Sequence, residues 1–246
     1  MTYCLGILLP TGLVLASDSR SNAGVDQIAL ARKMSLITMP GDRMIAILSA
    51  GNLGTTQSVV SQLRQAVGSG DIEWDMHAAR TLFDVASMVG SKLREVTDRD
   101  TRYVQAYGDP TGSFLVGGQI AGEEPRLFQI YSAGNFVEAS SRSRFLQIGE
   151  TKYGKPILDR VLDHQTSLDE AAKLAMLSFD ATIRSNLSVG TPIDLLRYEI
   201  DSFSVDNLVT VVDGDPYWMS IKRAYADGLS ALVDALPPPP PAAPSS

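Results

Sequence analysis

The chain has 246 residues, a hydrophobic content of 44% and a formal net charge of −7. The hydrophobic content is enough to fill a sizeable core, and we expect one large domain over residues 1–236. The acidic balance argues against a nucleic-acid partner, because binding to phosphates depends on basic patches. No run approaches the roughly 18 apolar residues of a membrane helix, and no basic region precedes the first apolar stretch, as a secretory signal would require. We therefore expect no membrane association.

Cysteine and histidine are scarce. Cys4 is the single cysteine, so no internal disulfide can form, which favours a reducing, cytoplasmic location. Its place in an alternating apolar strand predicts a buried core residue and not a nucleophile. His77 and His164 are the two histidines. The chain has no Gly-x-Ser-x-Gly elbow and no cluster with metal-ligand spacing, so we expect neither a metal nor a cofactor.

Residue 2 is a threonine that leads directly into an alternating apolar strand, residues 3–9. Methionine aminopeptidases generally remove Met1 when the next residue is small. Thr2 would then carry both its hydroxyl and a free α-amine, whose unperturbed pKa is about 7.7–8.0. Such an amine can act as a general base, and a threonine hydroxyl activated by its own amine is a known kind of nucleophile.

A first hairpin is predicted from the turn at residues 10–12. If Leu9 faces Leu13, Cys4 falls opposite Asp18. Thr2 then lies one diagonal step from Asp18, within reach of its side chain.

A second hairpin is predicted over residues 34–49, with its turn at residues 40–43. If Met39 faces Met44, Lys33 pairs with Ala50, beside Gly51. Residues 19–32 join the open ends of the two hairpins. The prediction is therefore that Thr2, Asp18, Lys33 and Gly51 share one end of a sheet.

Each of these groups has a chemical use beside a nucleophilic Thr2. Lys33 can lower the pKa of the hydroxyl and relay its proton, and Asp18 can keep the lysine charged and oriented. The backbone N–H of Gly51 can donate to the oxyanion of a tetrahedral intermediate. Taken singly, each has an ordinary reading as a turn residue, a solvated charge or a strand end. Their joint occurrence favours the catalytic interpretation.

The rest of the chain alternates helices and strands. Apolar residues at helical or alternating spacing distinguish the helices from the strands. Ser167 begins one helix with the pattern of a capping box. A final helix carries an apolar stripe that ends at residue 236, and the proline-rich residues 237–246 are expected to form a flexible tail. The predicted helices are 54–67, 76–96, 152–162, 167–184 and the stretch around 229–236; the predicted strands are 113–120, 126–132, 145–149, 195–201 and 207–212.

Residues 2–54 resemble the start of a proteasome β subunit, and more narrowly the bacterial "ancestral beta subunit" (Anbu) proteins. Thr2 matches the family's nucleophile, residues 16–20 its aspartate segment, Arg32-Lys33 its catalytic lysine, and residues 49–51 its oxyanion glycine. The resemblance implies an α+β fold, the four-layer αββα sandwich of N-terminal nucleophile hydrolases with two antiparallel sheets. It also implies that Ser21, Arg32 and Ser49 line the main specificity pocket.

Two positions depart from the family pattern. A Gly-Ser-Gly stretch is replaced by Ile148-Gly149-Glu150-Thr151. In the late Asp-x-x-Ser motif, Ser188 takes the place of the serine, while Ser185 replaces the aspartate. These positions normally help to orient the terminal amine, so the departures bear on the efficiency of catalysis.

Three functions follow from the resemblance. The first is a threonine peptidase acting on peptides or unfolded proteins inside a ring or spiral of identical subunits, with an unidentified regulator as a further partner. The second is a catalytically silent scaffold of the same fold. Scaffold-type α subunits carry a helical extension before the first strand, and its absence here favours the β type. The third is an amidase for a small amide substrate.

Overall fold

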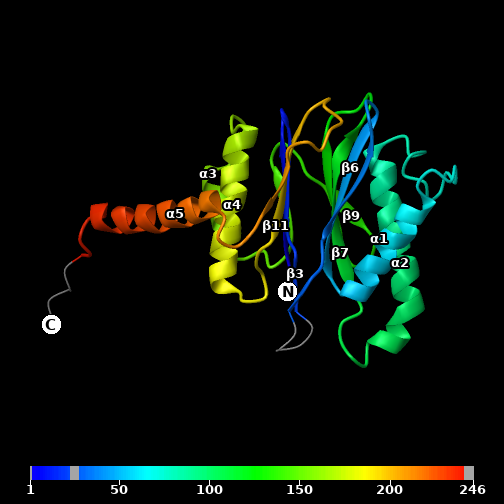
Figure 1. The fold of residues 1–246 in the computed structure, drawn as a ribbon, viewed down its shortest axis with the longest axis horizontal. Coiled ribbons are helices and arrows are strands. Elements are labelled where there is room, and N and C mark those ends of the chain that lie inside the picture. The colour runs from blue at the N-terminus through cyan, green and yellow to red at the C-terminus, as the bar shows by residue number, and fades with distance from the viewer. Residues whose placement is uncertain (1, 23–27, 241–246) are drawn as a thin grey trace.

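The computed structural model describes residues 2–22 and 28–240. Its strands form two five-stranded antiparallel sheets (Figure 1). Sheet I has the strand order β10-β1-β2-β11-β12, and sheet II has the order β5-β6-β7-β8-β9. A short β3-β4 ribbon leaves the end of β2. The strands are β1 (Tyr3–Leu9), β2 (Gly12–Asp18), β3 (Arg20–Asn22), β4 (Ile28–Leu30), β5 (Met34–Met39), β6 (Arg43–Gly51), β7 (Gly112–Ile120), β8 (Arg126–Ile130), β9 (Phe136–Glu138), β10 (Phe145–Gly149), β11 (Ile193–Glu199) and β12 (Leu208–Val211).

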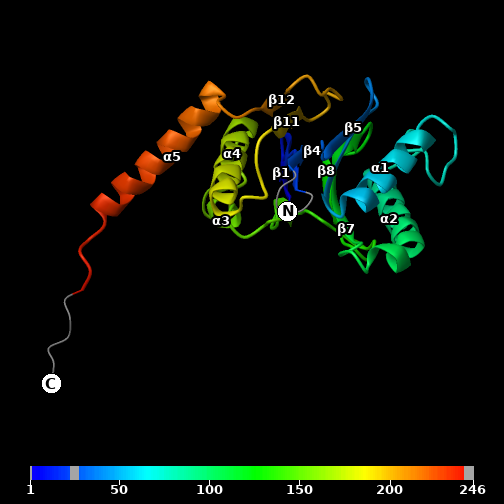
Figure 2. The same ribbon diagram turned by 60° about the horizontal axis from the view of Figure 1, so that its bottom comes forward.

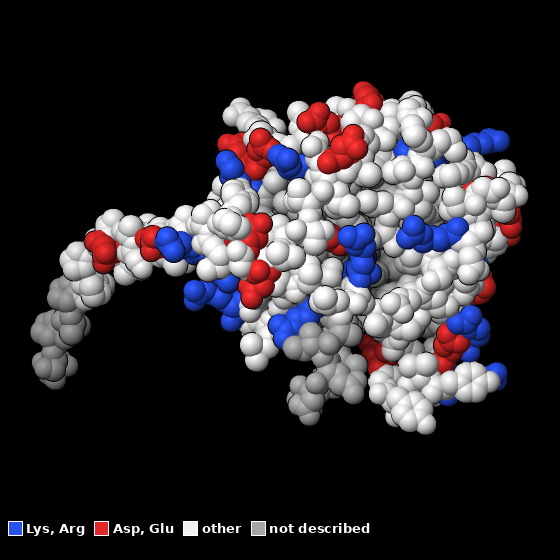
Figure 3. Space-filling view, viewed as in Figure 1, with Lys and Arg blue, Asp and Glu red and all other residues white. Residues whose placement is uncertain are grey.

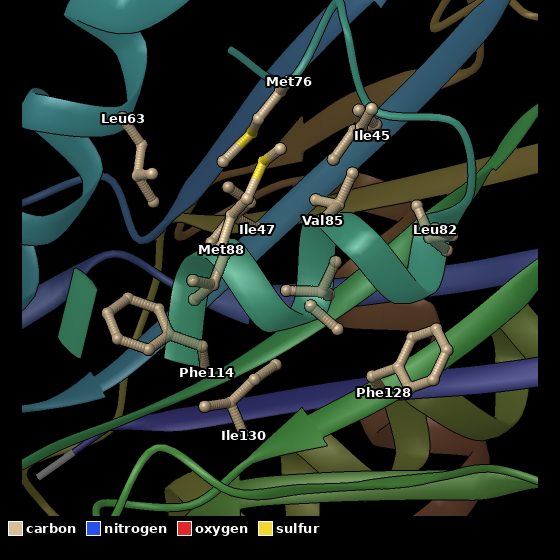
Figure 4. Packing of buried hydrophobic residues seen from close by; sticks show 14 of the residues in the cluster. Ile45, Ile47, Leu63, Met76, Leu82, Val85, Met88, Phe114, Phe128 and Ile130 are labelled. Carbon is tan, nitrogen blue, oxygen red and sulfur yellow. The ribbon is translucent and has the colours of Figure 1, made fainter. Parts of the chain in front are cut away.

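Helices cover the outer face of each sheet (Figures 1 and 2). The helices are α1 (Leu53–Ala66), α2 (Leu82–Val104), α3 (Lys155–Val161), α4 (Leu168–Ser185) and α5 (Pro216–Ala235). Three apolar clusters fill the layers: one between α1–α2 and sheet II, one between α3–α4 and sheet I, and one between the two sheets. Figure 4 shows the first, in which Met88 and Val85 of α2 pack with Phe114 and Ile130 of sheet II. The expected four-layer αββα sandwich is confirmed.

The register of the first hairpin differs by one residue from the expected one. Leu9 faces Gly12, and Cys4 faces Ser17 instead of Asp18. Gly12 is the first residue of β2 and has a φ of +142°. A Cβ at this position would lie 2.0 Å from the Tyr198 carbonyl oxygen. The close approach of β11 thus admits only a glycine, which leaves a two-residue turn where the sequence had suggested three.

The second hairpin is also shifted by one residue. Met39 pairs with Arg43 and not with Met44, because Gly41 adopts φ +71° and closes a shorter turn. As a result Lys33 lies beside Ser49 and not beside Ala50, with the Ser49 N–H 3.1 Å from the Lys33 carbonyl oxygen.

Helix α2 begins at Leu82, six residues later than expected. Thr81 and Asp84 form a capping box that fixes this start. The preceding turn is held by the buried Asp75, whose carboxylate accepts backbone N–H groups from Gly68, Gly70 and His77 at 2.8–2.9 Å. These local bonds outweigh the helical spacing of residues 76–81.

The other predicted elements are present, β10 with its expected bounds and most of the others with shifted ends, and the capping box at Ser167 is confirmed. Cys4 is fully buried, as expected. The short strands β3, β4 and β9 were not predicted. Within the described residues, no helix combines the length and apolar character needed to cross a bilayer.

Helix α5 projects away from the sandwich (Figures 1 and 2). Its first turns pack on α4 through the buried Trp218 and the neighbouring Ile221. Beyond them the helix is exposed, including the apolar side chains of Leu229, Leu232 and Val233. The charged groups on the face shown in Figure 3 are scattered, with few on the projecting helix.

Candidate active site

Asp18 and Lys33 form a buried ion pair. Asp18 is the last residue of β2, and Lys33 immediately precedes β5. The Lys33 Nζ lies 2.7 Å from Asp18 Oδ1 and donates to the Arg20 carbonyl oxygen at 2.5 Å. Asp18 is fully buried and Lys33 is 6% exposed. A buried lysine requires such partners, so the strand-end reading of Lys33 as a solvated charge is wrong.

The same carboxylate reaches the start of the chain. The backbone N–H of Tyr3 donates to Asp18 Oδ1 at 3.0 Å. The observed pairing of β1 with β2 explains this contact. Cys4 faces Ser17, so the next pair along the two strands brings residue 3 opposite residue 18. Thr2, which is partly buried, is therefore joined through the following peptide N–H to the Asp18–Lys33 pair.

Electrostatics at the pair reflect its burial. Desolvation raises the pKa of the Asp18 carboxyl, while the Lys33 ammonium and the Tyr3 N–H act in the opposite direction. Burial likewise raises the pKa of the Cys4 thiol, and the nearby Asp18 charge adds to this. The Cys4 Sγ lies 3.5 Å from the Ser49 carbonyl oxygen. Cys4 thus stays a neutral thiol, unsuited to act as a nucleophile.

A second set of contacts holds Thr2 from the side of β10. The Glu150 N–H donates to the Thr2 carbonyl oxygen at 2.7 Å. Gly149, at φ +82°, lies so near that a Cβ would meet the same oxygen at 2.0 Å. The stretch that departs from the Gly-Ser-Gly pattern is therefore the one that lies against Thr2.

Gly51 ends β6 at φ +111°. A Cβ there would lie 2.6 Å from the Thr111 carbonyl oxygen, so the position requires glycine. Gly51 and Gly149 line one cleft of about 350 Å³ between the two sheets, together with Gln147 and Tyr131. Thr2 does not itself line this cleft; Gly149 connects the two, because it lines the cleft and lies against the Thr2 carbonyl oxygen.

Ser188 is linked to Thr2 through two intermediate residues. The Ser188 N–H donates to Asn186 Oδ1 at 2.9 Å, and Asn186 Nδ2 donates to Glu150 Oε2 at 2.9 Å. Glu150 is buried and bonds Thr2 as described above. Ser185, by contrast, is exposed at the end of α4.

The three predicted pocket residues take different positions. Ser49 is partly buried beside Lys33. Arg32 is exposed, with its Nε 3.2 Å from Asp194 Oδ2. Ser21 lies in β3 opposite Ala29 of β4, and its side chain lies outside the described part of the structure.

The described residues contain no group of three or more His, Cys, Asp or Glu side chains arranged to hold a metal ion. Around residue 2 the site offers a hydroxyl, a buried ammonium with its carboxylate, and backbone N–H groups near a cleft.

Sequence reasoning missed the contacts of Glu150 and Asn186 and the Tyr3 N–H. Glu150 was noted only as a departure from a pattern. The Asn186 amide gave no signal, because its partner lies 36 residues away in the sequence.

Two stacked antiparallel sheets between helical layers, with a threonine immediately before β1, define the class of N-terminal nucleophile hydrolase folds. The family described as "Proteasome subunit" matches residues 2–196, so the chain belongs to the proteasome subunit family. Within that family it belongs to the ancestral beta-subunit (Anbu) proteins, as the following solved structures show.

The Anbu structure from Yersinia bercovieri is 43% identical and has a TM-score of 0.92, covering 98% of this chain and 100% of that one. A structure from Pseudomonas aeruginosa, described as a helical assembly of the Anbu complex, is 44% identical with a TM-score of 0.92, covering 97% and 98%. More distantly, proteasome subunit beta 1 of Thermococcus sibiricus is 23% identical over 82% of this chain and 88% of its own length. Proteasome subunit alpha 1 of Haloferax volcanii is 23% identical over 87% and 84%.

Proposed function

We propose that this protein is a threonine peptidase that hydrolyses peptide bonds through Thr2 after removal of Met1. The observation that carries the proposal is the buried Asp18–Lys33 pair, tied by one carboxylate oxygen to the backbone N–H that follows Thr2. Burying an ion pair costs desolvation energy that folding alone does not require. Its place beside residue 2 is therefore best explained by catalysis.

The proposed mechanism assigns one step to each group. The Thr2 Oγ attacks the carbonyl carbon of the substrate, and its proton passes to the Thr2 amine with help from Lys33. Asp18 keeps Lys33 charged and in place. The Gly51 N–H stabilises the oxyanion. The amine returns the proton to the leaving group, and water then hydrolyses the acyl ester to regenerate Thr2.

Thr2 itself is held by a different arrangement from the one that the family pattern suggested. Glu150 bonds the Thr2 carbonyl oxygen through its backbone N–H, and its side chain is held by Asn186. We propose that this link, with Ser188 at its far end, does the orienting work of the Gly-Ser-Gly and Asp-x-x-Ser motifs.

We further propose that the chain acts inside an assembly of identical subunits, in the reducing cytoplasm, on peptides or unfolded proteins. Two observations support self-assembly: a relative at 44% identity has been solved as a helical assembly, and the apolar stripe of α5 has no partner among the described residues of its own chain. A second copy is the proposed occupant of that stripe. Residues 1–236 would then form one hydrolase unit with its docking helix, followed by a flexible tail.

The second candidate is a scaffold of low or absent activity. Two features favour it: Ser185 replaces the expected aspartate and is exposed, and α-type subunits are among the similar proteins. Hydrolysis of a small amide by the same residues is the remaining alternative, in which the enclosing assembly would serve no purpose.

Intact mass of the native protein, before and after incubation with a peptide epoxyketone, tests the proposal. An epoxyketone needs both the hydroxyl and the free amine for its ring adduct. We expect loss of Met1 and one adduct on Thr2. Thr2→Ala is the matched control, since it also permits Met1 removal but lacks the hydroxyl. Full retention of Met1 in native protein, or equal adduct on Thr2→Ala, would sink the catalytic proposal.

A further inference from the structure

Two consecutive basic residues each meet a buried carboxylate from neighbouring strands. Lys33 contacts Asp18 of β2, and Arg32 contacts Asp194 of β11. Asp18 pairs with Ile193, the residue before Asp194. Because side chains alternate between the faces of a sheet, Asp18 and Asp194 belong to opposite faces of sheet I. Residues 32 and 33 thus hold this end of the sheet from both sides.

Asp194 is a buried carboxylate that lies between Thr210 of β12 and Arg32. Its side chain is 2% exposed, and Oδ1 accepts the Thr210 hydroxyl of β12 at 2.6 Å. Oδ2 faces the Arg32 Nε at 3.2 Å. The Arg32 side chain is 64% exposed, so solvent screens the pair and it adds little to the free energy of folding. The Asp194 carboxylate is itself fixed by Thr210, so its charge restrains the Arg32 side chain, and with it the adjoining backbone, by attraction and not through a hydrogen bond.

The backbone around Lys33 has few other restraints. The Ala31 N–H donates to the Ser19 carbonyl oxygen at 2.8 Å, and the Ser49 N–H donates to the Lys33 carbonyl oxygen at 3.1 Å. These bonds fix the backbone of Ala31 and the carbonyl of Lys33, while among the described residues the backbone of Arg32 has no hydrogen bond of its own. A lysine has four flexible methylene groups, so its Nζ keeps one position only if its backbone is fixed.

We propose that Asp194 is a positioning residue: by holding Arg32 it fixes the backbone from which Lys33 reaches Asp18. The consequence for catalysis rests on the proposed threonine peptidase function. The consequence for the position of the Lys33 side chain does not depend on that function, and it can be measured separately.

The first experiment measures how fast Lys33 reacts in folded Asp194→Asn protein. Reductive dimethylation labels accessible amines, and mass spectrometry of a digest that does not cut at lysine gives the rate for each site. We expect Lys33 to be labelled several-fold faster than in the wild type. Lys92 is the internal control, because it is 7% exposed and lies 2.6 Å from Glu95, far from this end of sheet I. No change at Lys33, or an equal rise at both lysines, overturns the proposal.

Two further variants keep the test decisive if Asp194→Asn folds poorly. Thr210→Val removes one partner of Asp194 without changing charge, and it should raise Lys33 labelling by a smaller factor. Arg32→Gln breaks the proposed contact from its other end. Combined with Asp194→Asn, it should raise labelling no more than either change alone, because both remove one contact. Additive increases would show that Asp194 acts by another route.

The catalytic consequence is read from the kinetics of Thr2 modification by the epoxyketone. Asp194→Asn should lower the rate at saturating reagent by a few-fold, the size expected for a solvent-screened pair, with the half-saturating concentration little changed. A general loss of stability would not lower the saturating rate of the folded protein while leaving the half-saturating concentration unchanged. A wild type that never reacts at Thr2 counts against the proposed function, while the lysine labelling still decides the role of Asp194. A saturating rate that stays at the wild-type value counts against positioning.

Discussion

The Lys33 ammonium and the Tyr3 backbone N–H share one oxygen of Asp18, at 2.7 Å and 3.0 Å. Asp18 thereby joins the buried lysine to the peptide that follows Thr2. A substitution at residue 18 should therefore affect both the charge of the site and the position of the first residues of the chain.

The first prediction concerns the two charges. Asp18→Asn and Lys33→Met should each lower the rate of Thr2 modification by about 10²–10⁴-fold, because each removes acid–base assistance. Each should also cost about 3–5 kcal/mol of unfolding free energy, since it leaves a buried charge without its partner. Reaction rates and denaturant unfolding measure the two effects.

The double variant separates catalysis from stability. Asp18→Asn combined with Lys33→Met leaves no unpaired charge, so most of the lost stability should return. Reactivity should not return. A double variant that regained wild-type reactivity would remove both residues from the mechanism.

The second prediction concerns Gly149. Gly149→Ala should abolish Thr2 modification and lower stability, because the new Cβ would lie 2.0 Å from the Thr2 carbonyl oxygen. Gly122→Ala is the matched control: its φ of +90° is similar, but no atom lies within 4 Å of the added Cβ. The control should cost only about 1–2 kcal/mol of backbone strain and keep full reactivity. Equal loss of reactivity in both variants would contradict the proposed contact with Thr2.

The third prediction concerns α5 as the docking element. Leu232→Lys places a charge in the exposed apolar stripe and should shrink the assembly measured by light scattering after size exclusion. Ala231→Lys adds the same charge on the opposite side of the helix, where assembly should be unaffected. A Leu232→Lys protein of wild-type size would show that α5 does not carry the subunit contact.

The fourth prediction is a pH dependence of stability through Asp75. Burial alone would raise the pKa of Asp75, but backbone N–H groups of Gly68, Gly70 and His77 lower it below its usual range. Because the folded-state pKa is the lower one, the carboxylate stabilises the fold above the unfolded pKa of about 3.9, and the effect is lost as pH falls through the folded pKa.

Asp75→Asn tests this sign. It should cost roughly 1–3 kcal/mol at pH 7, since the amide cannot accept all of these bonds. The difference from the wild type should shrink steadily in denaturant titrations below about pH 4. Asp71→Asn in the same turn is the control, because Asp71 is exposed. A cost that is the same at pH 3 and pH 7 would contradict an ionised Asp75.

Local patterns were sufficient for much of the architecture. The capping box at Ser167 was predictable because its donors and acceptors lie within three residues of each other. The strand that begins at Tyr3, the two hairpins and the residue types of the site were also predictable from alternation and turn residues. A helix start at residue 76 was wrongly expected because the bonds to Asp75 compete with a helical pattern that is itself correct from Leu82 onward.

The sequence by itself therefore determined which residues are candidates for the active site and where most strands and helices lie. Only the tertiary structure decided the hairpin registers, because Gly12 joins β2 under the carbonyl of Tyr198, nearly two hundred residues later in the chain. It also decided that Glu150 holds Thr2, that Asn186 holds Glu150, and that Asp194 meets Arg32. Such contacts depend on the order in which β10, β1, β2 and β11 lie in one sheet, and spacing along the chain carries no record of that order.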